Sequence, residues 1–330
     1  SIMGAAFCVV EHSHFVNNSA RKYGALALTA THTTLTSNMF NRNMANVGGA
    51  LGIIENYMCN MSQSSYFFNS AKEGGVFYIR TVEKIFFSFS MFFQNIADDA
   101  YGGVLALYSV QFYSAGYCKF YHSISNGQGG SLALFDSESV NIRRCIFIMN
   151  KSLRDGGCIS TNVDALVVEF SMFKLSASKA NAGAIKSTDG SEIHIKNCKF
   201  HQNYAFHGGA LYVMGIVSGS SFLYLTNNQF INNTAERSGG NLYASHFMAI
   251  HFNMDTHRYS DTKKGKGGAM FIKYVNNISF YGLYIGYNFA LLSSGGGIFL
   301  SEIGCRINSR SIWACNVAGQ DGGSILITYV

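Results

Sequence analysis

Three aspartates recur at a fixed place in the sequence, six or seven residues after a glycine slot. They are Asp136, Asp164 and Asp189, and they fall in three consecutive segments of similar length. Carboxylates gathered in this way can bind calcium or act as general acid and base on a polysaccharide. Aspartate is also a common turn residue, and Glu55 and Glu302 hold the same position elsewhere. We interpret the three aspartates as turn residues and assign no catalytic residue. A polysaccharide lyase or hydrolase of the pectin-active type is the alternative.

The cysteines have a spacing that indicates packing rather than metal binding. Cys118, Cys145 and Cys198 each stand two residues before a phenylalanine, which places them in one register. Side chains stacked in register point the same way, so a buried thiol ladder is favoured over a disulfide between Cys118 and Cys145. A disulfide within one segment is an alternative for two pairs of cysteines, Cys145 with Cys158 and Cys305 with Cys315. No CxxC spacing occurs, so we expect neither a bound metal nor another cofactor.

Five asparagines stand in Asn-x-Ser/Thr sequences, at Asn17, Asn60, Asn150, Asn232 and Asn277. Asn17 and Asn232 each precede a repeated inward asparagine, so alternation should turn them toward solvent. We take Asn17, Asn60, Asn232 and Asn277 as glycosylation candidates. Asn150 is itself one of the repeated inward asparagines, and we expect it to be poorly accessible.

Other motifs with a known chemistry are missing. The sequence contains no GxSxG, P-loop or dinucleotide fingerprint. The segment Thr256–Lys266 (THRYSDTKKGK) is a long polar stretch, which we predict to be an inserted loop that contacts a partner. Passive glycan binding along an aromatic face is a third hypothesis beside scaffold and enzyme.

Glycine pairs recur along the whole chain and define a repeat of about 27 residues. Each pair is followed by a small or apolar residue and then by aliphatic or aromatic residues, as in GGALYV and GGVFYI. This pattern predicts a short strand that begins at a glycine turn. Single glycines, Gly24 and Gly183, fill two of the slots. The pairs are Gly48-Gly49, Gly74-Gly75, Gly102-Gly103, Gly129-Gly130, Gly156-Gly157, Gly208-Gly209, Gly239-Gly240, Gly267-Gly268, Gly295-Gly296 and Gly322-Gly323.

A second motif, an aromatic residue followed three positions later by an asparagine, precedes most of the glycine slots. Two variable residues separate the aromatic residue from the asparagine, and the copies include FVNN, FNRN, FFQN, FHQN and WACN. Degenerate copies end in Ser123, Ser176 and Asp255. If the segments stack, the asparagines form a polar ladder in which each amide bonds the segments above and below. The ladder positions are Asn18, Asn43, Asn69, Asn95, Asn150, Asn203, Asn233, Asn288 and Asn316.

These two alternating motifs predict an all-β fold, a right-handed single-stranded parallel β-helix of about 12 coils of about 27 residues. A coil of this length holds three short strands and shows no helical periodicity with caps. Leucine-rich repeats need leucines at fixed short spacings and propeller blades need about 40 to 50 residues, so neither fits. No break marks a domain boundary, and we expect residues 1–330 to form a single solenoid domain.

Composition agrees with this prediction and excludes several other classes. The 330 residues include 35 glycines and no proline, and 48% are hydrophobic while 13% are charged. Proline would remove a hydrogen-bond donor from strands that are paired on both edges. Disorder, collagen and a membrane-spanning helix are all excluded by these proportions and by the absence of a long apolar run. A net charge of +6 without a long basic run gives no reason to expect nucleic-acid binding.

The alternation of GG-plus-apolar and FxxN motifs resembles the repeat of the polymorphic outer-membrane-protein family of chlamydiae and of related secreted β-helix proteins. The resemblance covers essentially the whole chain and rests on structural motifs, which carry no catalytic residue. It implies an extracellular or cell-surface location and an adhesive or structural role. The C-terminus shows no membrane β-barrel signature, which departs from the bacterial family and puts autotransport in doubt.

The two ends of the sequence both fall within strands that follow a glycine, from Gly4 to Phe7 and from Ser324 to Ile327. A solenoid needs its apolar ends covered. We therefore expect either a segment of a longer solenoid or subunits that stack head to tail in a filament. The expected partners are further coils or copies of the chain, and glycans or cell-surface proteins. We expect no nucleic acid and no membrane span.

Overall fold

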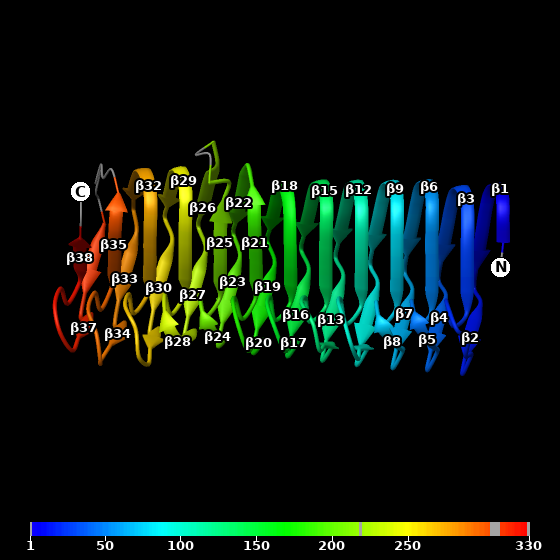
Figure 1. Ribbon diagram of the computed structural model, residues 1–330, viewed down its shortest axis with the longest axis horizontal. Helices are drawn as coiled ribbons and strands as arrows, with labels where there is room; N and C mark the ends of the chain where they lie inside the picture. Colours follow the sequence, from blue (N-terminus) through cyan, green and yellow to red (C-terminus); the bar gives the residue numbers. More distant parts are fainter. Residues whose placement is uncertain (1, 218–219, 304–310, 329–330) are drawn as a thin grey trace. The chain divides into compact units, whose positions relative to one another are not determined.

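The computed structural model describes residues 2–217, 220–303 and 311–328, and this part of the chain contains no helix. Parallel strands stack as a β-solenoid of about 12 coils, about 27 residues apart, which confirms the predicted all-β parallel fold (Figure 1). The chain divides into two compact units, Ser1–Val163 and Asp164–Val330. In each unit a coil passes in turn through three parallel sheets, named A, B and C below.

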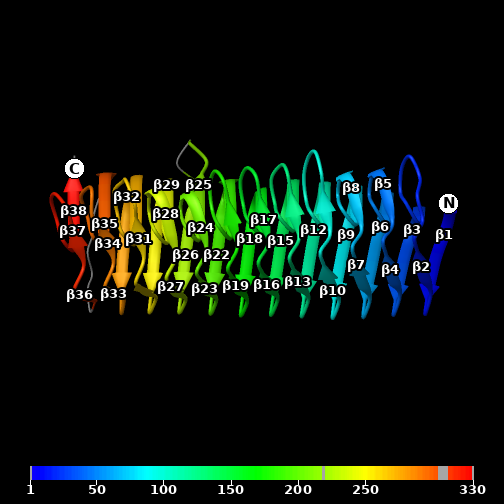
Figure 2. The ribbon, with the colours of Figure 1, turned by 90° about the horizontal axis from the view of Figure 1, so that it is seen from below.

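In the first unit the strands of each sheet pair in chain order, as Figures 1 and 2 both show. Sheet A contains the long strands β1 (Ile2–Glu11), β3 (Leu26–Thr36), β6 (Leu51–Ser62), β9 (Phe77–Ser88), β12 (Leu105–Gly116) and β15 (Leu132–Arg143). Sheet B contains β2 (His14–Val16), β4 (Met39–Asn41), β7 (Ser65–Phe67), β10 (Met91–Phe93), β13 (Lys119–Tyr121) and β16 (Ile146–Ile148). Sheet C contains β5 (Met44–Val47), β8 (Ser70–Glu73), β11 (Ile96–Ala97), β14 (Ile124–Ser125) and β17 (Lys151–Ser152).

The second unit repeats the plan, and the unit boundary falls within β18 (Ile159–Glu169) of sheet A. Sheet A continues with β21 (Ile185–Gly190), β22 (Glu192–Lys196), β25 (Leu211–Gly215), β26 (Phe222–Thr226), β29 (Leu242–Asn253), β32 (Met270–Tyr281), β35 (Ile298–Ile303) and β38 (Ile325–Thr328). Sheet B contains β19 (Met172–Lys174), β23 (Lys199–His201), β27 (Gln229–Ile231), β30 (Thr256–Arg258), β33 (Tyr284–Gly286) and β36 (Ile312–Ala314). Sheet C contains β20 (Ala177–Ser178), β24 (Tyr204–His207), β28 (Thr234–Ser238), β31 (Asp261–Thr262), β34 (Phe289–Ala290) and β37 (Val317–Ala318).

The motif aromatics form a buried stack in sheet B. In the first unit the Phe92 ring lies 4.8 Å from Tyr66 and 4.7 Å from Phe120, with interplanar angles of 6°. These spacings match the separation of neighbouring strands, because in-register parallel coils place identical positions directly above one another. In the second unit Phe200 and Phe230 stack in the same way at 4.8 Å. Burying each ring contributes roughly 2 to 3 kcal/mol, which makes this stack a main source of stability.

The predicted asparagine positions carry hydrogen bonds that join successive coils. Asn69 Nδ2 donates to Phe40 O at 3.0 Å and to Asn95 Oδ1 at 3.1 Å, and Asn69 Oδ1 accepts from Asn43 N and Nδ2. The backbone carbonyls at this corner therefore gain side-chain partners in a place where the strands turn away from each other. Hydrogen bonds of the same kind occur at Asn18, Asn43, Asn95, Asn150, Asn203, Asn233, Asn288 and Asn316.

A second polar ladder, which the sequence reading missed, lies two residues before the motif aromatic. Its members accept hydrogen bonds from the backbone of the preceding coil, as Asn38 Oδ1 does from Ser13 N at 2.9 Å and Ser64 Oγ does from Asn38 N at 3.1 Å. Cys118 occupies the same column, and its thiol donates to Gly116 O at 3.4 Å. The column could have been found in the sequence, because serine, asparagine and cysteine alternate there.

One degenerate motif was assigned to the wrong residues. The prediction placed a copy at Phe252 with Asp255 as its polar end, but β30 pairs His257 with the motif residue Phe230. Asp255 therefore belongs to the second ladder, where its Oδ1 accepts from Asn228 N at 2.8 Å. The polar end of the motif is Ser260, whose backbone N donates to the Asn288 side chain at 3.0 Å. Phe252 and Asp255 have the spacing of the motif, but they lie five positions before the residues that occupy the motif columns.

The two glycines of a pair meet two different requirements. Gly102 adopts φ of +66°, a left-handed conformation that favours glycine. Gly103 has no such φ, but a Cβ there would lie 2.2 Å from Gly130 O of the next coil. The second requirement is the stricter one, because no rotamer can relieve a clash between Cβ and a neighbouring backbone. This explains why single-glycine slots keep the second position, with Tyr23 and Ala182 taking the positive φ.

Non-glycine residues also adopt the left-handed conformation at the corners and in a bulge of sheet A. In the bulge, Glu55, Thr81, Ser109 and Asp136 have φ between +51° and +57°. Thr81 is the most strained member, because β-branched side chains are rare in this region. The register between β9 and β12 is the same on both sides of the bulge, since Arg80 pairs with Tyr108 and Val82 pairs with Val110, while Thr81 and Ser109 have no partner in this ladder.

Replacing this strained threonine should stabilise the protein. We expect Thr81→Gly to raise the free energy of unfolding by about 1 kcal/mol, because glycine adopts positive φ without a Cβ clash and this gain exceeds its entropic cost. Urea unfolding followed by circular dichroism measures the change. The matched control is Thr226→Gly in β26, an ordinary strand position, where we expect a loss of about 1 kcal/mol. Equal losses at both positions would contradict the assigned strain.

Candidate functional site

The three aspartates do not form a catalytic cluster within either unit. Asp136 lies in the first unit, where its Oδ1 accepts from Asn162 Nδ2 at 3.3 Å, and Asp164 and Asp189 lie in the second. All three are exposed, and Asp136 and Asp189 have positive φ as members of the bulge column. In the described residues no hydrogen bond joins Asp164 to Asp189, and no group of three His, Cys, Asp or Glu side chains is placed to hold a metal ion. Turn chemistry accounts for their positions.

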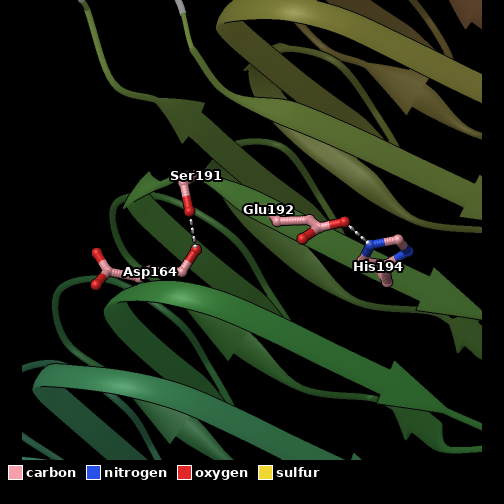
Figure 3. A network of polar contacts seen from close by, with 4 residues as sticks. All are labelled: Asp164, Ser191, Glu192 and His194. Atoms are coloured by element: carbon pink, nitrogen blue, oxygen red, sulfur yellow. Dashed lines mark hydrogen bonds and ion pairs between the residues drawn. The ribbon is translucent and has the colours of Figure 1, made fainter.

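Polar contacts around Asp164 also lack a catalytic arrangement. Ser191 Oγ donates to the backbone O of Asp164 at 2.8 Å, while the Asp164 carboxylate points away from that contact (Figure 3). On β22, His194 Nε2 and Glu192 Oε1 lie 2.8 Å apart, and the imidazole stacks on Tyr224 at 4.5 Å. The His194 and Glu192 side chains are largely exposed, and an ion pair of this kind contributes at most about 1 kcal/mol. His194 and Glu192 lie on the outer face of sheet A.

The cysteines lie as the thiol-ladder prediction required. Cys118, Cys145 and Cys198 are buried, and none of them forms a disulfide. Cys158 forms no disulfide either, so it is not bridged to Cys145. Burial raises the pKa of Cys198 to about 12, which keeps this thiol protonated and unreactive. The pair proposed for Cys305 and Cys315 cannot be compared, because Cys305 lies outside the described residues.

The glycosylation candidates differ in exposure. Asn17, Asn232 and Asn277 are exposed, and Asn60 is half-buried on the outer face of β6. Asn150 is 1% exposed and its side chain donates to Phe120 O at 3.0 Å. An oligosaccharyl group cannot be attached to an amide held inside the core.

The exposure of each asparagine therefore predicts which of the five sequons carry a glycan. When the chain is expressed through a secretory pathway, we expect glycans at Asn17, Asn232 and Asn277, and none at Asn150. Mass spectrometry of glycopeptides, before and after enzymatic release of the glycans, measures the occupancy of each site. A substantial glycan fraction at Asn150 would contradict the inward register of the asparagine ladder.

The segment Thr256–Lys266 is not the inserted loop that we predicted. Its first residues form β30 and β31, which pair in register with β27 and β28. Only Lys263–Lys266 form a corner, and this corner is tied to the preceding one by Lys264 N donating to Glu236 O at 2.9 Å. The sequence reading counted these strands as a loop because His257 and Ser260 had not been identified as the motif residues.

This corner contributes to a groove in the second unit, which we call the basic groove. The groove has a volume of about 570 Å³ and lies between sheet A and the corners that precede two glycine pairs. Its walls carry Arg237, Lys264 and Lys266, and its floor carries Phe271 and Phe299 from β32 and β35. The described residues that line it include these three cations and no carboxylate.

The floor belongs to an outward aromatic column that the sequence reading did not identify. Tyr212, Tyr243, Phe271 and Phe299 each stand three residues after the second glycine, and their rings stack at 4.6 to 5.2 Å. Lys266 Nζ lies 4.3 Å from the centroid of Phe299, at a distance typical of a cation–π contact. The signal was present in the strings GGALYV and GGAMFI, but it was interpreted only as strand propensity.

Lys263, in the same corner, differs from the cations of the groove because it is paired with a carboxylate. Lys263 Nζ lies 3.0 Å from Glu236 Oε1, and the Tyr204 hydroxyl donates to the same carboxylate. Hydrogen bonds from Tyr204 and Lys263 lower the pKa of Glu236, so this carboxylate is charged at neutral pH. Because Glu236 is paired with Lys263, it forms no ion pair with Lys264 or Lys266. The basic groove can therefore bind anionic groups.

Comparisons with protein-family models, curated proteins and solved structures give no match. Within the described part of the chain, no helix is long and apolar enough to cross a membrane.

Proposed function

We propose that this chain is a non-enzymatic, extracellular structural or adhesive β-solenoid. The observation that carries the proposal is the use of the inward polar side chains. Asparagines such as Asn69 and Asn203 bond the coil before and the coil after, so the polar groups of the interior hold coils together. A chain whose coils are joined by such bonds at most of its repeats suits a fibre, a stalk or a surface appendage that resists extension.

Two further features support an adhesive role at a cell surface. Exposed sequons at Asn17, Asn232 and Asn277 suit a glycoprotein. The GG and FxxN motifs are similar to those of secreted solenoids. The aspartates that a polysaccharide lyase or hydrolase would need form no cluster placed to hold a metal ion within the described residues of either unit.

Adhesion by coated beads tests this proposal. Beads carrying the folded chain should remain on cells of the organism that makes it after washing under flow, and beads carrying albumin should not. Antibodies against the chain should label those cells without permeabilisation. Beads that wash off as albumin beads do, together with labelling only after permeabilisation, would overturn both the adhesive role and the location.

A further inference from the structure

We propose that the basic groove of the second unit binds an acidic polysaccharide, whose sulfate or carboxylate groups contact Arg237, Lys264 and Lys266. This inference rests on the adhesive function proposed above and assigns its ligand class. The three cations are exposed, and within the described residues none of them forms an ion pair. The described residues that line the groove include no carboxylate, and like charges gathered in this way attract an anion with several charged groups.

The cations are carried by corners that are held in place. Gly239 N donates to Lys266 O at 3.1 Å, and Lys264 N donates to Glu236 O at 2.9 Å. Within the second corner, Thr262 Oγ1 donates to Gly265 O at 2.9 Å. A ligand therefore meets backbone positions that are already ordered, and binding costs little loop entropy.

The positions of the cations suit a polymer. Arg237 lies near the end of β28, just before Gly239, and Lys264 and Lys266 lie in the corner before Gly267, one coil later. Consecutive strands of a sheet are about 4.8 Å apart, so the cations of these two neighbouring coils lie about one strand spacing apart along the stack. A chain of sugars that carries a charged group at regular intervals can contact both corners at once.

Hydroxyl groups complete the groove. Ser238 lies beside Arg237 on the wall, and Ser293, Ser301 and Thr328 also line the groove. Hydroxyls donate and accept hydrogen bonds, as sugar hydroxyls do, while the Phe271 ring offers an apolar contact to the C–H groups of a pyranose. The combination of cations, hydroxyls and an aromatic edge matches an acidic sugar.

The ring stacking argues against nucleic acid as the ligand. Single-stranded nucleic acids bind by stacking bases on free aromatic faces. Here Phe271 and Phe299 stack on each other at 5.2 Å with an interplanar angle of 2°, and Lys266 covers Phe299. Phe299 is 2% exposed, so Phe271 is the ring of the floor that can contact a ligand, and a base would find no free face on which to stack.

Binding measurements on the whole chain test the proposal. The probes are heparin, polygalacturonate, a neutral dextran and a single-stranded DNA oligonucleotide of matched charge, each fluorescently labelled. We expect heparin or polygalacturonate to bind, more weakly as salt increases, and dextran not to bind. The two acidic probes separate sulfate from carboxylate recognition. The triple variant Arg237→Gln, Lys264→Gln and Lys266→Gln should raise Kd for the acidic glycan at least tenfold.

Two control variants keep the test specific to the groove. Lys179→Gln, Lys196→Gln and Lys199→Gln remove the same charge from exposed positions of the same unit and should change Kd less than threefold. Lys264→Arg with Lys266→Arg keeps the charge and should keep the binding. Equal losses in the two triple variants, tighter binding of DNA than of either acidic glycan, or tight binding of dextran would each overturn the ligand assignment. If triple-variant beads still adhere to cells as wild-type beads do, the ligand assignment fails and the adhesive function stands.

Discussion

Gly103→Ala should destabilise the first unit by at least about 3 kcal/mol, a large loss for a single methyl group. The new Cβ would lie 2.2 Å from Gly130 O and 2.7 Å from Ile124 O, so the backbone of the next coil has to move. Moving that coil disturbs its hydrogen bonds as well, because Gly103 N donates to Gly129 O at 3.2 Å. Urea unfolding followed by circular dichroism measures the effect.

Gly116→Ala is the matched control for this substitution. Gly116 ends β12 in the same coil and has no positive φ, and a Cβ added there would meet no atom within 4 Å. We expect alanine there to be neutral or to stabilise by up to about 1 kcal/mol, since it lowers the entropy of the unfolded chain. A loss of less than about 1 kcal/mol for Gly103→Ala would mean that the coils do not approach as closely as described.

Asp255→Asn should stabilise the second unit by up to about 4 kcal/mol at pH 8 and by little at pH 4. Burial raises the pKa of Asp255 from 3.8 to about 7. Its Oδ1 accepts from Asn228 N and Nδ2, whereas Oδ2 has no hydrogen-bond partner among the described residues. Asparagine is a regular member of this ladder, and Asn228 Nδ2 donates to Ile195 O at 2.8 Å. An amide at position 255 can donate to the equivalent carbonyl of Leu225 without burying a charge.

The direction of the pH effect follows from the raised pKa. In the folded state Asp255 holds its proton more tightly than in the unfolded state, so its favourable contribution is complete below about pH 4 and is lost as pH rises through about 7. The wild-type chain should therefore lose stability over this range relative to Asp255→Asn. His257 acts in the opposite direction in both proteins, because burial lowers its pKa to about 3 and its contribution is lost as pH falls below about 6.5.

Urea unfolding at several pH values compares the variant with the wild type. Asp164→Asn is the control, because this carboxylate is exposed and the same substitution should change the free energy of unfolding by less than about 0.5 kcal/mol at each pH. A difference between wild type and Asp255→Asn that stays constant from pH 4 to pH 8 would contradict a buried carboxyl group that titrates near neutrality.

The repeat could be predicted where its defining side chains are present. Phe92 and Asn95 stand at the expected spacing, and both occupy their predicted columns. Prediction failed where His257 and Ser260 replace those residues. The imidazole and the hydroxyl group take the same positions in the structure, but neither residue type matches the aromatic-x-x-Asn motif in the sequence. The exchange is visible only when the strands are paired.

The different structural roles of the two glycines in a pair could not be derived from spacing alone. Both glycines recur with the same period, but Gly102 is required by its backbone conformation and Gly103 by the proximity of the next coil.

The basic groove could not be predicted from the sequence either. Arg237, Lys266 and Phe299 are far apart in sequence and meet because coils stack in register. The sequence predicts an inserted loop around Lys264 and Lys266 and does not single out Arg237.

The length of an acidic polysaccharide after incubation with the protein tests the non-enzymatic adhesive role most directly. Polygalacturonate and heparin are incubated with excess chain, with and without calcium, and their size distribution is measured by size-exclusion chromatography after the protein is removed. We predict that bound glycan is recovered at its original length. Shortened chains that no longer form when Asp164→Asn replaces the wild-type protein would contradict the scaffold and establish a polysaccharide-cleaving enzyme.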